Sequence, residues 1–81
     1  MLEPKLQKIA DLLQGIRPEF DFSNGANFIA TGMLDSFDMI TLVDTLDKTY
    51  GISIDGEDIV PEHFGGLSAI AALLGRYGVR P

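Results

Sequence analysis

Apolar residues recur at helical spacing in three stretches of the chain, and polar or turn-forming residues separate these stretches. The first stretch covers residues 3–16, with Pro4 in the first turn, where proline is tolerated. The second lies within residues 32–50, and the third runs from about Leu67 to Tyr77. Each has one apolar face, typical of helices that pack around a shared core. The apolar faces consist of Leu6, Ile9, Ala10, Leu13 and Ile16; Met39, Leu42, Val43, Leu46 and Tyr50; and Leu67, Ile70, Ala71, Leu74 and Tyr77.

The connection between the first two helices, residues 17–34, is long for a compact domain. Gly15 and the Arg17-Pro18 step are expected to end the first helix. The connection nevertheless contains apolar side chains that a flexible linker would lack, so we expect a loop packed on the core. Its apolar residues are Phe20, Phe22, Phe28, Ile29, Met33 and Leu34.

The segment after the second helix is expected to form an extended loop and a short helical turn. Gly51 is a plausible helix C-cap, and Ile54 is expected to turn inward from an extended loop. Residues 58–64 predict a short helical turn that Pro61 limits, with Ile59 and Phe64 packed down. The sequence therefore predicts an all-α fold, a small bundle of three to four helices with a long packed loop between helices 1 and 2. Residues 1–81 are expected to form a single domain.

The second helix has an unusual outer face. Asp35 and Ser36 are good N-cap residues, so the helix is expected to begin there. Its free backbone N–H groups and its dipole would favour a phosphate at Ser36. The polar side of the helical wheel also holds two large apolar residues among acids, which indicates a surface for a partner protein. The residues on this side are Phe37, Ile40, Thr41, Asp44, Asp47 and Lys48.

These features resemble the acyl and peptidyl carrier proteins. The resemblance consists of D-S-F after Gly32, followed by L-x-x-x-L-x-x-x-Y-G ending at Gly51, and it extends through Phe64 to Leu74. It implies that Ser36, preceded by Asp35, carries phosphopantetheine, and that the packed loop belongs to the carrier fold.

The resemblance also implies a function. A phosphopantetheinyl transferase would attach the arm from coenzyme A, and a loading ligase or synthetase would place an acyl or aminoacyl group on its thiol. Downstream transferases would then use this thioester, so the chain would be a carrier and not an enzyme. Fatty-acid carriers commonly have leucine and glutamate where Phe37 and Thr41 stand. The match is therefore closer to stand-alone aminoacyl carriers, including the D-alanyl type.

The charge distribution narrows the choice of partners. The net charge is −6, and ten of the twelve acidic residues lie between Glu19 and Glu62, where Lys48 is the only basic residue. Nucleic acid is a poor partner for this negatively charged surface, whereas enzymes with basic docking patches are good partners. The absence of cysteine excludes disulfides and thiolate metal sites. The N-terminus lacks a signal-peptide pattern, and no apolar run reaches the ~18 residues that span a membrane. We expect a cytoplasmic monomer.

Three alternatives remain open. A serine hydrolase would have only His63 as its base, and the sequence has no nucleophile elbow. Residues 55–58 cluster acids around Gly56 but lack the spacing of an EF-hand loop, which leaves at most weak divalent-ion binding. An unmodified, acidic helical adaptor module is the third alternative, because docking and carrying would use the same outer face.

Overall fold

The computed structural model describes residues 4–22 and 27–79, and the regular structure in these ranges is helical. The elements follow the chain in the order α1 (Pro4–Ile16), α2 (Ser36–Tyr50), the 3₁₀ turn η1 (Gly56–Asp58), α3 (Pro61–Phe64) and α4 (Leu67–Arg76). No strand is present in the described ranges. The all-α bundle expected from the sequence is confirmed.

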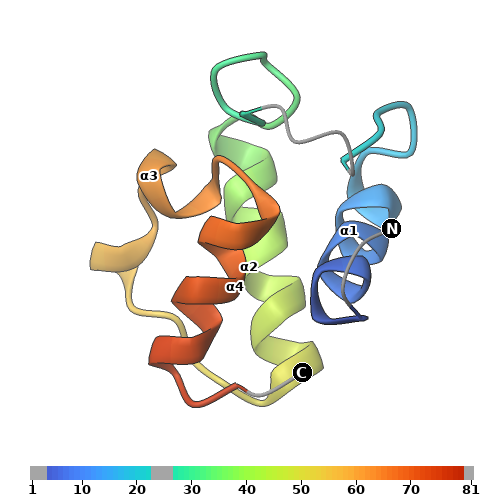
Figure 1. The fold of residues 1–81 in the computed structure, drawn as a ribbon. Helices are drawn as coiled ribbons and strands as arrows, with labels where there is room; N and C mark the ends of the chain where they lie inside the picture. Colours follow the sequence, from blue (N-terminus) through green and yellow to red (C-terminus); the bar gives the residue numbers. More distant parts are fainter. Residues whose placement is uncertain (1–3, 23–26, 80–81) are drawn as a thin grey trace.

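Helix α4 lies at the centre of the arrangement. Figure 1 shows α4 in front of α2, with α1 on one side and the short α3 on the other. Helix α4 contacts both α1 and α3, and α1 also contacts α2. Residues 27–34 of the loop between α1 and α2 lie at the end of the bundle where α2 begins (Figure 1). This loop and α3 therefore lie near the start of α2.

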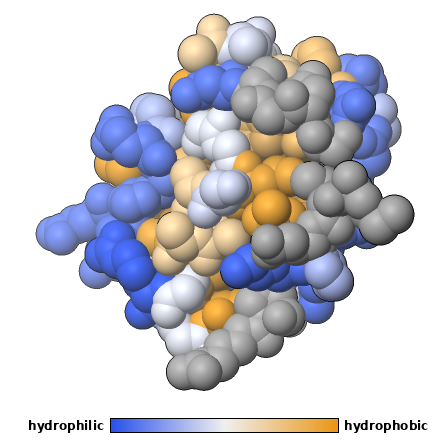
Figure 2. All heavy atoms as spheres, viewed as in Figure 1, coloured by the Kyte–Doolittle hydropathy of each residue, from blue (hydrophilic) through white to orange (hydrophobic). Residues whose placement is uncertain are grey.

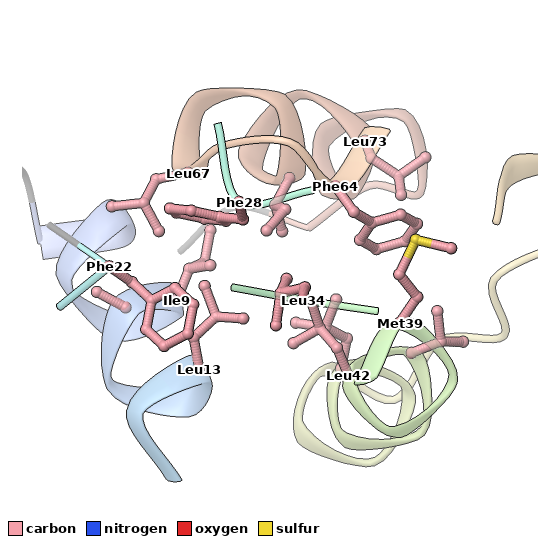
Figure 3. Close-up of a cluster of buried hydrophobic side chains, with 14 of the residues drawn as sticks. Ile9, Leu13, Phe22, Phe28, Leu34, Met39, Leu42, Phe64, Leu67 and Leu73 are labelled. Atoms are coloured by element: carbon pink, nitrogen blue, oxygen red, sulfur yellow. The ribbon is translucent and has the colours of Figure 1, made fainter. Parts of the chain in front are cut away.

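The core forms where the helices and the loop converge. Figure 3 shows its side chains pointing into one cluster from α1, the loop, α2, α3 and α4. Burying this apolar surface is the main favourable contribution to folding in a chain without disulfides. The fully buried large side chains are Phe22, Phe28, Phe64, Ile9, Leu13, Leu34, Leu42, Leu46, Ile70, Leu73 and Leu74.

The long loop is packed, as the sequence predicted. The rings of Phe22 and Phe28 meet edge to face, with 5.0 Å between their centroids. The Phe28 backbone N–H donates to the Gly65 carbonyl at 2.8 Å, which joins the loop to the end of α3. Met33 and Leu34 are buried, whereas Phe20 and Ile29 are half-buried against the core. The loop thereby holds the start of α2 against α3.

Gly51 and Tyr77 fix the second half of the chain. Gly51 ends α2 with φ 66°, a left-handed conformation that glycine adopts without steric cost. The Tyr77 hydroxyl donates to Asp58 Oδ2 at 2.6 Å and accepts from the Asp55 N–H at 2.8 Å. These bonds join η1 to the end of α4. Ile54 is buried, as predicted.

Three details of the expected fold were wrong. Gly15 lies inside α1, which continues to Ile16. The expected single turn over residues 58–64 is divided into η1 and α3, and Pro61 begins α3 because proline suits the first helical position. Leu73 is 1% exposed although the predicted stripe of α4 omitted it.

On the face that Figure 2 shows, apolar residues gather toward the middle and hydrophilic residues lie mainly toward the margins.

Candidate functional site

Ser36 is the first residue of α2 and is exposed. Asp35 before it is the N-cap, and its Oδ1 accepts the Asp38 backbone N–H at 2.9 Å. Asp38 Oδ2 in return accepts the Asp35 N–H at 3.2 Å, which completes a capping box. The serine hydroxyl therefore stands in solvent at the positively polarised end of a firmly capped helix.

An arginine from the end of α1 reaches this capping box. Arg17 Nε donates to Asp38 Oδ2 at 2.9 Å, and Nη1 pairs with Glu19 at 3.4 Å. Nη2 lies 3.7 Å from Asp35 Oδ2, which is an ion pair too long for a hydrogen bond. The hydrogen bond to Asp38 raises the pKa of Arg17. The backbone N–H of Asp38 lowers the pKa of Asp35, so both groups are charged at neutral pH.

Sequence reasoning missed Asp38 and Arg17. Asp38 is 8% exposed, and it is the one buried charged residue in the described ranges. The spacing of Asp35 and Asp38, three residues apart at a helix start, was the available signal, since it is the spacing of a capping box. Nothing in the local pattern pointed to Arg17, because its partner lies 21 residues away.

Among residues 4–22 and 27–79, the two exposed large apolar residues both lie on the outer face of α2. Phe37 is 80% exposed and Ile40 is 61% exposed. Thr41 is exposed beside them, and its hydroxyl donates to the Phe37 carbonyl at 3.1 Å. Their exposure agrees with the predicted orientation of the helix, and their use in docking stays a prediction.

The acids of this face are less free than the sequence indicated. Asp44 is exposed but pairs with Lys48 at 3.0 Å, one turn along the helix. Asp47 is half-buried, and its Oδ1 accepts the backbone N–H of Ile54 at 3.0 Å. Asp47, expected on the outer face as a docking residue, is partly turned inward because this carboxylate anchors the loop that follows α2.

The other candidate residues occupy structural positions. His63 lies in α3, with Nε2 3.8 Å from Asp58 Oδ1, and no hydrogen bond joins it to Ser36 in the described ranges. Asp55 Oδ1 accepts the Glu57 N–H at 3.0 Å and caps η1. Over residues 4–22 and 27–79, no group of three His, Cys, Asp or Glu side chains is placed to hold a metal ion. In the same ranges, no helix is long and apolar enough to cross a membrane.

The geometry at Ser36 fits a covalently attached phosphate ester. The hydroxyl is exposed, the helix dipole favours an anion there, and Arg17 supplies a nearby cation. An attached group has free access because Ser36 and its neighbours Asp35 and Phe37 are all exposed.

Comparison with known proteins agrees with this geometry. The family model described as "PP-binding: Phosphopantetheine attachment site" matches residues 6–74. A chain in a solved structure titled "Crystal structure of FAD-dependent dehydrogenase" is 34% identical, with a TM-score of 0.60. The match covers 86% of this chain and 97% of that chain. A search of curated proteins found no match.

The family match decides between the alternatives that the sequence left open. Domains of this family carry phosphopantetheine covalently and present it to other enzymes, so the chain is a carrier and not a serine hydrolase. The match runs from residue 6 in α1 to residue 74 in α4, so it includes the packed loop and the whole of α2. The chain belongs to the phosphopantetheine-attachment family of carrier domains.

Proposed function

We propose that Ser36 carries the phosphopantetheine arm and that the arm holds an acyl or aminoacyl group as a thioester. The observation that supports this most strongly is the position of Ser36, exposed at the first residue of α2 between the capping Asp35 and the exposed Phe37. A phosphopantetheinyl transferase supplies the arm. The Ser36 hydroxyl displaces the adenosine bisphosphate part of coenzyme A, its proton passes to the transferase, and a phosphodiester forms.

The arm supplies a reactive thiol to a chain that has no cysteine of its own. The residues of the chain then do three things. The start of α2 stabilises the phosphate through its dipole, the capping box keeps Ser36 in a fixed place, and the bundle presents the site to partners. A flexible tether raises the effective concentration of the cargo at each partner enzyme.

Partner enzymes are proposed to dock on the outer face of α2. Phe37 and Ile40 would enter an apolar pocket of the partner, because large exposed apolar side chains are the usual anchors of such contacts. Thr41 and Asp44 would lie at the rim, where a basic patch on the partner could face Asp44. We leave Asp47 out of this face because its carboxylate is engaged with the Ile54 N–H.

The partners themselves are proposed from chemistry. A loading ligase or synthetase forms the thioester, and downstream transferases consume it. The cytoplasm is the proposed location, because the modification requires coenzyme A.

A FAD-dependent dehydrogenase is proposed as a further partner. The match to the structure titled "Crystal structure of FAD-dependent dehydrogenase" covers 86% of the present chain but 97% of the matched chain. The matched chain is therefore the shorter of the two. Its length and its likeness support a carrier acting together with a flavin enzyme. In such a step the cargo loses two hydrogens, one as hydride to the flavin and one as a proton, and becomes unsaturated. When the loaded carrier is incubated with such a dehydrogenase, the mass of its cargo should fall by two hydrogens and the flavin absorbance should bleach.

The test of carrier function is modification in vitro. The purified protein is incubated with coenzyme A, Mg²⁺ and a broad-specificity transferase, and the intact mass is measured. The wild type should gain one phosphopantetheinyl group, and Ser36→Ala should fold normally and gain none. A wild type that stays unmodified while a control carrier is modified would favour the unmodified adaptor.

A further inference from the structure

Arg17 contacts both acids of the capping box beside the proposed attachment site, and three carboxylates surround it. Asp38 holds Nε at 2.9 Å, Glu19 lies 3.4 Å from Nη1, and Asp35 lies 3.7 Å from Nη2. Asp38 is buried, whereas the side chains of Asp35 and Glu19 are more than half exposed. Arg17 is itself partly exposed, so its outer edge faces solvent beside the start of α2.

A phosphodiester on Ser36 would add another negative charge to this acidic group. Among the described residues between Glu19 and Glu62, the only basic residue is Lys48. Lys48 lies twelve residues further along α2, about 18 Å along the helix axis. Screening at physiological salt acts over about 8 Å, so Lys48 is too distant to compensate the added charge. Arg17 contacts Asp35 and Asp38 at this end of α2, so it is placed to compensate the added charge.

The contacts of Arg17 differ in strength. Its bond to the buried Asp38 is short and charge-assisted, and this bond fixes the guanidinium. Its contact with Asp35 is the longest of the three and has no hydrogen bond. A planar guanidinium can donate from several N–H groups at once and is well matched to phosphate oxygens. The Nη2 group can therefore change partners without loosening the anchor at Nε.

We propose that Arg17 binds the non-bridging oxygens of the phosphodiester on Ser36. This proposal rests on the proposed function, because it requires the arm to be on Ser36. Nε stays on Asp38, and Nη2 exchanges Asp35 for the phosphate. Arg17 thereby restrains the root of the arm at the junction of α1 and α2, and the rest of the arm stays mobile.

The direct test compares the apo and holo forms of the wild type by NMR. The guanidinium nitrogens of Arg17 should shift on modification, and those of Arg76, which ends α4, should not. The phosphorus line of the holo protein should become narrower in Arg17→Gln, because the root of the arm is released. Lys48→Gln is the matched control, since it removes one positive charge from the same acidic surface, and its phosphorus line should match the wild type.

The outcomes separate this proposal from the proposed function. If Ser36 never accepts the arm, both fail. If the arm is on Ser36 but the Arg17 nitrogens do not shift, only the binding by Arg17 is overturned. Equal phosphorus lines in Arg17→Gln and Lys48→Gln overturn it as well. Should Arg17→Gln not fold, Arg17→Lys keeps a positive charge for Asp38 but lacks the second N–H arm that would reach the phosphate. The phosphorus line should then become narrower than in the wild type, and an unchanged line overturns the proposal.

Discussion

Replacing Phe37 with alanine tests whether α2 is turned as described, with this ring facing solvent. Phe37 is 80% exposed, so about a fifth of its surface is shielded. A phenylalanine side chain buries on the order of 200 Å² when enclosed, and a fifth of this is roughly 40 Å². At ~25 cal/mol per Å², the lost burial costs about 1 kcal/mol. The higher helix propensity of alanine offsets about half of this cost. The free energy of unfolding should therefore fall by less than about 1 kcal/mol.

Leu46→Ala is the matched control on the same helix. Leu46 is 0% exposed, and truncating such a core leucine costs about 2–5 kcal/mol. A domain of 81 residues has a total stability of about 4–12 kcal/mol, so this variant should be clearly weakened. The two substitutions thus separate the outer face of α2 from its inner face.

The assay runs urea unfolding beside transferase turnover. Phe37→Ala should unfold close to the wild type but lose about tenfold in kcat/KM for modification, as expected for an apolar anchor at an interface. Any loss of kcat/KM in Leu46→Ala should be explained by the fraction of that variant that is unfolded. The reasoning is refuted if Phe37→Ala loses more than about 3 kcal/mol, since that is the cost of a core phenylalanine. A fully stable Phe37→Ala that is modified at the wild-type rate refutes the docking role instead.

Three further predictions concern polar side chains. Asp38→Ala should lower the free energy of unfolding by about 2 kcal/mol in urea titration, because Asp38 Oδ2 accepts from the Asp35 N–H and from Arg17 Nε and both bonds are lost. Asp47→Ala should cost about 1–3 kcal/mol without slowing modification of the folded protein, whereas Asp44→Ala should cost less than about 0.5 kcal/mol. The hydrogen bond to Asp58 raises the pKa of Tyr77. The stability that this bond gives the fold is therefore fully present below the ordinary tyrosine pKa. This stabilisation is lost as the pH rises through the raised value, so thermal unfolding of Tyr77→Phe should show a smaller alkaline loss than the wild type.

Patterns local in sequence predicted most of this fold. Helical spacing identified α1, α2 and α4, since an apolar stripe must be buried somewhere in a chain of this size. The cap residues Asp35 and Gly51 fixed the ends of α2, because backbone groups at helix ends need particular partners or conformations. The exposure of Phe37 and Ile40 followed from the same helical wheel.

Contacts between distant residues could not be read in this way. Asp47 lies at the boundary between the two faces of α2, and only the folded loop brings the Ile54 N–H to its carboxylate. Arg17 and Asp38 meet only when α1 and α2 are packed. Pro61 was read as a break, although proline also suits the first position of a helix, and the sequence alone does not choose between these two uses.

The central claim is that Ser36 carries phosphopantetheine, and the most direct test is the site-resolved mass of the protein purified from the cells that make it. The account predicts one phosphopantetheinyl group, with or without a thioester-bound cargo, on the peptide that contains Ser36. The peptides that contain Ser53 and Ser68 should be unmodified. An unmodified Ser36 in cells whose other carriers are modified, or the same group on a different serine, would contradict the account.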